Sequence, residues 1–275
     1  MQEAVDDFCW FGIAVMVSVA GWMLGRRAGS AGDRTARLAA ILGVVLLIAW
    51  TWLLRHPAVG VRLVPVSLLA RVEGTGSVPM FALILGVCWE RARVARQRAV
   101  VGWAVALGIV YLANGGGWLL QQTPDAVMGR STRATGSEAL VMQSQDFSCV
   151  PAACATLLRR WGEPASEANM ARLTRTRAGS GSTMLRALEG LSERLAGADL
   201  RPVLLQVDYA DLVRLPMPLI TPLQNEASRR HMVAIDRRVA AGYVLLDPID
   251  GVYWIGDDQL ASSFIGQVIV LEERR

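Results

Sequence analysis

Three residue types in the C-terminal half of this 275-residue chain could together perform acyl transfer: a cysteine, a histidine and an aspartate. Cys149 lies where the sequence predicts the first turn of a helix. Ser148 and Asp146 can cap this helix, and Pro151 is tolerated in its first turn. A thiol at a helix N-terminus feels the positive end of the helix dipole, which favours the reactive thiolate. Cys149 is therefore a candidate nucleophile, and the alternative is a small buried apolar side chain, as most free cysteines are.

A cysteine nucleophile needs a base and a third group that orients the base. Besides His56, which lies among apolar segments, the chain has one histidine, His231. His231 opens a predicted strand and Asp247 closes the next one, with a turn predicted over residues 237–242. A hairpin centred near Val239 would place His231 opposite Asp247, with Cβ atoms about 4.5–5.5 Å apart. The alternative is a structural pair at a sheet end, and a slip of one residue would separate the two faces.

An acyl-transfer site also needs hydrogen-bond donors aimed at the developing oxyanion, and losing one typically costs about 10²- to 10³-fold in rate. The backbone N–H of Cys149 is one candidate donor. Two glutamines precede the cysteine, Gln143 and Gln145, and either side-chain amide could be the second donor. Gln145 is the weaker candidate, because glutamines near a turn are commonly only solvated.

Helices followed by strands must position these residues. Capping and stop signals predict three helices: one from Cys149 to a stop at Gly162, one after Ser166, and one capped by Ser182 or Thr183. Apolar runs then predict five strands, at residues 201–207, 218–223, 231–237, 242–248 and 267–272. One or two helical turns are predicted at residues 209–215, between the first two strands. This order is typical of an α+β domain with an antiparallel sheet.

The segment MQSQDFSCVPAACATLLRRWG, residues 142–162, resembles the active-site segment of the bacteriocin-processing, double-glycine cysteine peptidases, which have a papain-like fold. Those proteins place a glutamine six residues before the cysteine, as Gln143 precedes Cys149. The segments GSGSTMLRALEGL, PLITPL, HMVAI and YVLLDPIDG resemble further family segments, so the likeness covers about residues 138–272. It implies a cysteine peptidase that hydrolyses peptide bonds. The roles it implies are nucleophile for Cys149, base for His231, orienting residue for Asp247 and oxyanion donor for Gln143.

The first 120 or so residues are too apolar for a wholly soluble protein. Hydrophobic residues make up 53% of the chain, its mean hydropathy is +0.35, and the excess is concentrated here. Four segments could span a membrane: residues 8–24, 38–54, 74–89 and 99–120. The third segment is short and could instead be a re-entrant segment. The sequence thus predicts a transmembrane domain over 1–121, a linker over 122–137 and a papain-like cysteine peptidase domain over 138–275.

Arginine placement predicts the orientation of these spans. The loops after the first and third spans are the richest in arginine: Arg26, Arg27, Arg34 and Arg37 in one, and Arg91, Arg93, Arg96 and Arg98 in the other. Both loops should therefore be cytoplasmic, and four spans put both termini outside. We expect an integral protein of a bacterial inner or cytoplasmic membrane, with the peptidase domain extracytoplasmic.

Composition argues against several other functions. The formal net charge is +4, but no stretch combines clustered base-reading side chains with aromatics, so nucleic acid is an improbable partner. With no Cys-x-x-Cys pair and only two histidines, a zinc site of the usual kind is nearly excluded, and no cofactor is expected. The expected partners are a peptide or protein substrate, membrane lipid and, by resemblance, peptide-export machinery.

Two alternatives remain open. A non-catalytic peptide-binding accessory module of a peptide-export system would keep the fold without turnover. A transglutaminase-like acyl transferase would use the same three residue types. The reactivity of Cys149 separates the accessory module from a peptidase, and product analysis separates the transferase.

Overall fold

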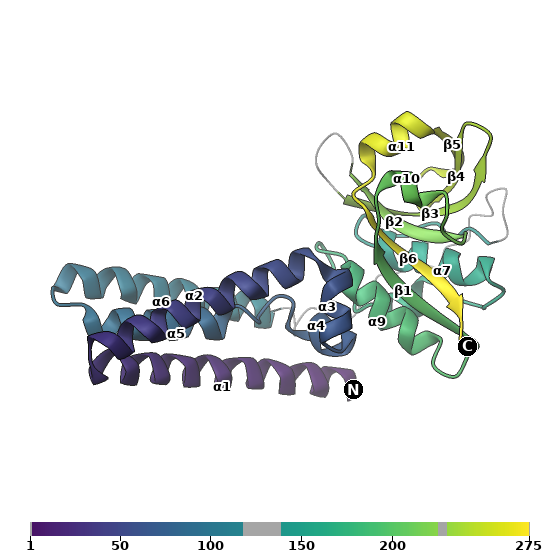
Figure 1. The fold of residues 1–275 in the computed structure, drawn as a ribbon. Helices are drawn as coiled ribbons and strands as arrows, with labels where there is room; N and C mark the ends of the chain where they lie inside the picture. Colours follow the sequence, from purple (N-terminus) through teal and green to yellow (C-terminus); the bar gives the residue numbers. More distant parts are fainter. Residues whose placement is uncertain (1, 118–138, 225–229, 275) are drawn as a thin grey trace. The chain divides into compact units, whose positions relative to one another are not determined.

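The structure is a computed structural model that describes residues 2–117, 139–224 and 230–274 (Figure 1). The chain divides into two compact units, Met1–Gln121 and Gln122–Arg275, which we call the helical unit and the sheet unit. The predicted linker, residues 122–137, lies outside the described residues.

The described part of the helical unit consists of α1 (Gln2–Ala31), α2 (Asp33–Arg55), α3 (Pro57–Leu63), α4 (Val66–Val72), α5 (Val78–Arg91) and α6 (Ala95–Gly117). By length and composition, two helical segments are fit to cross a membrane: Cys9–Ala31 and Asp33–Arg55. The third and fourth predicted spans coincide largely with α5 and α6, but the 14 residues of α5 rise only about 21 Å, against a hydrocarbon core of about 30 Å. A count of four spans therefore stays a prediction.

Glycines spaced four residues apart let α1 pack closely against α5. Gly21, Gly25 and Gly29 all meet α5, and a Cβ added at Gly25 would lie 2.1 Å from the carbonyl oxygen of Leu83. Gly86 of α5 meets the backbone of α1 in the same way, with 2.4 Å between an added Cβ and the nearest carbonyl oxygen. Small residues at this spacing allow two helix backbones to approach, as at helix interfaces in membranes.

Two ion pairs join the ends of α1, α2 and α5. Arg26 near the end of α1 pairs with Glu90 of α5, and Asp33 at the start of α2 pairs with Arg91. The pairs bring the loop after α1 next to the loop after α5. These are the two arginine-rich loops that the sequence assigns to one side of the membrane, and which side that is stays a prediction.

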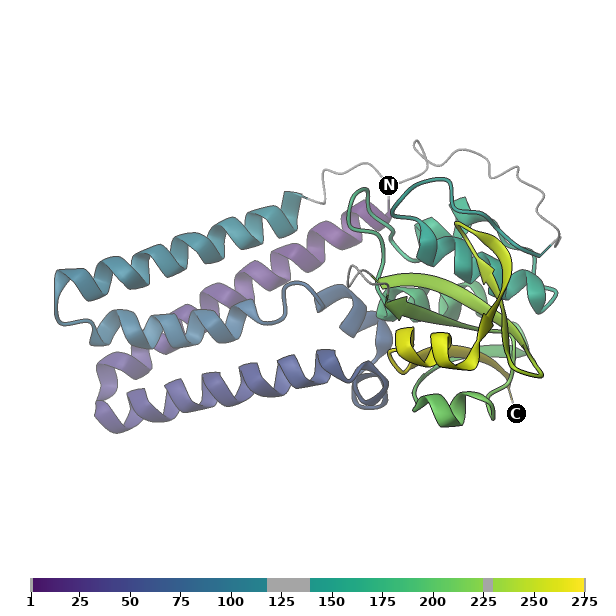
Figure 2. The ribbon, with the colours of Figure 1, turned by 90° about the horizontal axis from the view of Figure 1, so that it is seen from above.

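The sheet unit begins with the helices α7 (Cys149–Arg160), α8 (Glu167–Leu173) and α9 (Met184–Arg194). Its remaining elements are β1 (Leu200–Gln206), α10 (Tyr209–Leu212), β2 (Leu219–Gln224), β3 (Arg230–Val239), β4 (Gly242–Asp247), β5 (Gly251–Gly256), α11 (Asp257–Ser263) and β6 (Gln267–Glu273). The strands form one antiparallel sheet in the order β1-β6-β2-β3-β4-β5. They are labelled in Figure 1, and Figure 2 shows the same ribbon from above. The prediction of helices followed by an antiparallel sheet is confirmed, although the sequence did not predict β5 or α11.

The predicted helix boundaries rest on local signals that the structure contains. Gly162 follows α7 with φ of +79°, a conformation that glycine adopts at little cost, so it ends the helix as expected. The Ser166 hydroxyl accepts a hydrogen bond from the backbone N–H of Asn169 and caps α8. Of the two cap candidates for α9, the structure selects Thr183, which accepts from Arg186 N–H.

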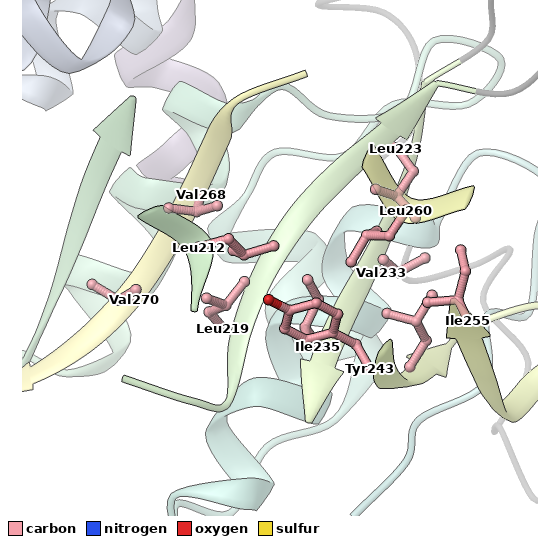
Figure 3. Packing of buried hydrophobic residues seen from close by; sticks show 11 residues of the cluster. Leu212, Leu219, Leu223, Val233, Ile235, Tyr243, Ile255, Leu260, Val268 and Val270 are labelled. Atoms are coloured by element: carbon pink, nitrogen blue, oxygen red, sulfur yellow. The ribbon is translucent and has the colours of Figure 1, made fainter. Parts of the chain in front are cut away.

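Residues two apart along the central strands point to one face of the sheet and form its main hydrophobic core. On β3 these residues are Val233 and Ile235, and the cluster includes Leu212 from α10 and Leu260 from α11 (Figure 3). The same alternation places His231, at the start of β3, on this face of the sheet.

The hairpin of β3 and β4 turns later than predicted. β3 continues to Val239, and the turn comprises residues 240–241 rather than being centred on Val239. The register also shifts at a β-bulge, because β3 carries one extra residue, Asp236, that has no partner on β4. Beyond the bulge Ile235 pairs with Leu245, so the predicted register is wrong by two residues there.

Candidate active site

Cys149 is the first residue of α7, as predicted. The helix is buried along most of its length, from Val150 to Leu158, so packing fixes the position of its first turn. Ser148 stands at the N-cap, but its hydroxyl makes no capping hydrogen bond, so the predicted cap by the Ser148 side chain is wrong. The Ser148 hydroxyl instead contacts the buried carboxylate of Glu167, with 2.6 Å between Oγ and Oε1.

His231 and Asp247 meet although they are not directly opposite each other. Extending the register beyond Ile235 and Leu245 places Asp247 opposite Val233, two residues from His231. A shift of two residues keeps both side chains on one face, and diagonal neighbours are within reach of long side chains. The His231 Nε2 lies 2.8 Å from Asp247 Oδ1.

Asp247 is a well-held carboxylate. Its side chain is 3% exposed, and Oδ1 also accepts hydrogen bonds from the backbone N–H groups of Ile249 and Asp250 at 2.7 and 3.2 Å. Burial alone raises the pKa of Asp247, but the hydrogen bonds and the positive charge of His231 outweigh it, so the pKa is lowered. Asp247 is therefore ionised at neutral pH and can hold the imidazole in one orientation.

The thiol of Cys149 makes a hydrogen bond with the His231 side chain and further hydrogen bonds with backbone groups of Met232 and Val150. Burial raises the pKa of Cys149, but these hydrogen bonds and the charge of His231 lower it, and the net pKa lies below 9.0. Because Asp247 occupies Nε2 of His231, the nitrogen left for the sulfur is Nδ1.

The imidazole between these two groups is basic. Burial lowers the pKa of His231, but hydrogen bonds with Asp247 and Cys149 and the charges of both raise it to about 9. At neutral pH the proton therefore resides on His231, and Cys149 is drawn toward its thiolate. A lowered thiol pKa beside a raised imidazole pKa favours a thiolate–imidazolium pair, the state from which a cysteine nucleophile reacts.

Gln143 lies beside the end of β4. Its backbone N–H donates to the carbonyl oxygen of Pro248, the residue after Asp247, at 2.9 Å. Its side-chain Oε1 is buried and has no hydrogen-bond partner within the described ranges. Gln145 belongs to the turn before α7, where its backbone N–H and carbonyl both contact the Ser148 hydroxyl. The role of either amide as an oxyanion donor stays a prediction.

Glu167, at the start of α8, contacts the loop before Cys149, a contact that the sequence does not predict. Its carboxylate is buried and accepts a hydrogen bond from the backbone N–H of Ser144 at 2.7 Å, besides contacting Ser148. It therefore fixes both ends of the loop between Gln143 and Cys149. A glutamate after an N-cap usually marks only a favourable helix-dipole charge, so nothing in the sequence indicates that its carboxylate is buried.

The described cysteines are all free, and among the described residues no group of three His, Cys, Asp or Glu side chains could hold a metal ion. The Cys154 thiol on α7 is fully buried, and burial raises its pKa. Cys149 is the half-buried member of the pair.

A model of the Peptidase C39 family matches residues 137–275, half of the chain and the whole described sheet unit. The chain belongs to this family. An uncharacterized protein of Methanothermobacter marburgensis is 34% identical over 137 residues, which are 50% of this chain and 90% of that protein. A second uncharacterized protein, from Methanothermobacter thermautotrophicus, is 31% identical over 137 residues with the same coverage.

Among solved structures, the peptidase domain of Streptococcus ComA, a bi-functional ABC transporter involved in quorum sensing, is 20% identical with a TM-score of 0.44. That match covers 50% of this chain and 98% of the other. A double glycine motif protease from an AMS/PCAT transporter, solved with its leader peptide, is 18% identical with a TM-score of 0.41. It covers 54% of this chain and 96% of the other.

Proposed function

We propose that this chain is a membrane-anchored cysteine peptidase in which Cys149, His231 and Asp247 act as a catalytic triad. One observation carries the proposal. The imidazole of His231 binds the buried carboxylate of Asp247 and also hydrogen-bonds the thiol of Cys149 at a helix start. A cysteine with a purely structural role needs neither contact, whereas peptide-bond hydrolysis needs both.

In the proposed mechanism the Cys149 thiolate attacks the carbonyl carbon of a peptide bond, and a C–S bond forms. The carbonyl π electrons move to the oxygen, which the Cys149 N–H and the Gln143 side-chain amide stabilise. His231 then gives its proton to the amide nitrogen as the C–N bond breaks, leaving a thioester. Water attacks the thioester while His231 takes a proton from it, and the Cys149 sulfur leaves.

The helical unit would keep this site at a membrane. α1 and α2 are long and apolar enough to cross it, and the arginine-rich loops at their shared end favour that end as cytoplasmic. Four crossings would place the sheet unit on the extracytoplasmic side. Protease added to intact cells and to spheroplasts should then digest a C-terminal tag in at least one of the two, and digestion only after lysis would overturn this orientation.

Cleavage of peptides by the purified full-length chain in detergent tests the proposed activity. By resemblance to the double-glycine peptidases, the first substrates are peptides with a Gly-Gly sequence, presented within a mixed peptide library. We expect wild-type protein to create new N-termini, detected by mass spectrometry. Cys149→Ala should reduce their formation by about 10⁶-fold, effectively to background.

The matched control is Cys154→Ala, which removes a second thiol from the same helix. Cys154 is buried and its thiol pKa is raised, so its loss should leave cleavage intact. Equal cleavage by wild type and Cys149→Ala, with Cys149 no more reactive toward iodoacetamide than a model thiol, would instead favour the accessory binding module.

A further inference from the structure

The extra residue of the β3 bulge carries a buried charge. The Asp236 side chain is 3% exposed, and the described strands give it no ladder partner: β2 pairs with β3 only as far as Ile235, and β4 resumes at Arg237. Two arginines neutralise its carboxylate. Arg160 Nη2 lies 2.6 Å from Oδ1, and Arg237 Nη1 lies 2.5 Å from Oδ2.

The two arginines differ in what they connect. Arg237 is the next residue of β3, and its side chain is 62% exposed, so its ion pair stays within one strand. Arg160 is the last residue of α7, the helix that begins with Cys149. The Arg160–Asp236 pair therefore joins the far end of the nucleophile helix to the strand that carries His231.

The part of α7 between Cys149 and Arg160 is as long as the part of β3 between His231 and Asp236. From Cys149 to Arg160 the helix rises about 16 Å at 1.5 Å per residue. From His231 to Asp236 the strand rises about 16 Å at 3.3 Å per residue. One end of this pair of elements is joined by the hydrogen bonds of Cys149 with His231 and Met232, and the other end is joined by the ion pair.

We propose that Arg160 and Asp236 are a positioning pair, which keeps α7 and β3 from sliding along each other and so holds the sulfur of Cys149 at the imidazole of His231. The inference rests on the proposed function. A displacement of about 1 Å can cost about 100-fold in rate even when its cause lies far from the reacting atoms. A buried ion pair adds little net stability compared with apolar residues, which suits a role in setting position.

The bulge itself contributes to the same geometry. If Asp236 paired with Leu245 instead of bulging, the register at the turn would continue and place Asp247 opposite Ala234, on the other face of the sheet from His231. Bulges re-aim side chains near active sites in this way. The bulge at Asp236 thus sets whether the side chains of His231 and Asp247 lie on the same face of the sheet. The ion pair with Arg160 holds this part of β3 against α7.

The test compares Arg160→Ala with Arg237→Ala in the full-length protein in detergent. Each variant removes one arginine from the same carboxylate, and only the first disconnects α7. The rate of Cys149 alkylation by iodoacetamide is measured against pH, with the Cys149 peptide quantified by mass spectrometry. We expect the apparent thiol pKa to rise by about one unit in Arg160→Ala, so that alkylation at a pH below the wild-type pKa slows by about tenfold. In Arg237→Ala the alkylation rate should change by less than about twofold.

Equal profiles for the two variants, or an unchanged profile in folded Arg160→Ala, would overturn the positioning role. If Arg160→Ala does not fold, Arg160→Lys and Arg237→Lys are compared instead, and the larger change must again be at 160. Wild-type protein separates this inference from the proposed function. An ordinary thiol profile in wild type refutes the peptidase itself, whereas a lowered pKa that both variants retain refutes only the positioning pair.

Discussion

The two units of the chain use apolar residues in opposite ways. The helical unit exposes most of its large apolar side chains, including Ile41 and Trp103. Among the described residues of the sheet unit, only four such side chains are exposed: Val213, Ile249, Val252 and Trp254. Its other large apolar residues form cores such as the cluster around Ile235. The helical unit suits a lipid environment, whereas the sheet unit suits water.

The two units are also held together by different kinds of contact. The helices α1 and α5 meet through backbone contacts at glycines, where little side chain is available to bury. The sheet unit has a packed core, and its buried charges at Asp236, Asp247 and Glu167 are all paired or hydrogen-bonded. The candidate catalytic residues all belong to the sheet unit. Mutations there should therefore change the chemistry without changing the packing of α1 against α5.

The largest effect on turnover, after loss of the nucleophile, is expected for Asp247→Asn. The amide fits the same space but cannot stabilise the imidazolium, so peptide cleavage should fall by about 10⁴-fold. The pKa of His231 should fall with it. Asp250→Asn is the control, because Asp250 is exposed and contacts Asp247 only through its backbone N–H. Similar losses in both variants would mean that the carboxylate of Asp247 has no special role.

Gln143→Ala should reduce cleavage by about 10²- to 10³-fold without changing the alkylation of Cys149. An oxyanion donor acts on the substrate oxygen and not on the thiol, so the cleavage rate should fall while the alkylation rate stays unchanged. Gln145→Ala is the matched control two residues away. A loss in Gln145→Ala with full activity in Gln143→Ala would reverse the assignment of the donor.

Cleavage and alkylation should also respond differently to high pH. The pKa of His231 is raised to about 9, so the imidazole keeps its proton below that pH and loses it above. Proton delivery to the leaving amine then fails, and cleavage should fall about tenfold per pH unit above about pH 9. Alkylation needs only the thiolate and should not fall. A parallel decline in both rates would contradict the role of His231 as the acid.

The sequence was sufficient for the elements of the sheet unit where local signals decide them. The start of α7 at Cys149 and its stop at Gly162 follow from residues within the helix ends themselves. The strands of His231 and Asp247 follow from apolar runs. The family resemblance favoured Gln143 over Gln145, and the structure places the Gln143 backbone beside Pro248.

The register of the β3–β4 hairpin could not be predicted, because it depends on contacts between distant elements. The turn residues Ala240 and Ala241 carry no glycine or asparagine signal, so the strand appeared to end too early. The bulge residue Asp236 forms its ion pair with Arg160, 76 positions earlier in the chain. Glu167 likewise becomes part of the site only through the burial of its carboxylate.

The helical unit shows a different kind of omission. Gly21, Gly25 and Gly29 are visible in the sequence at a spacing of four, but such a pattern does not name the helix it contacts. That partner is α5, whose Gly86 completes the close approach. The packing gives α5, although short, a defined place in the helical unit.

The smallest expected effect on chemistry comes from Gly25→Ala, which tests whether the two units are energetically separate. The new Cβ would lie 2.1 Å from a carbonyl oxygen of α5, so α1 and α5 must move apart at a cost of about 1–3 kcal/mol. Gly12→Ala is the control on the same helix, where an added Cβ meets nothing within 4 Å. Thermal unfolding in detergent should detect the loss for Gly25→Ala alone. The alkylation profile of Cys149 should stay at its wild-type value in both variants, and a shifted profile in Gly25→Ala would show that the helical unit supports the active site directly.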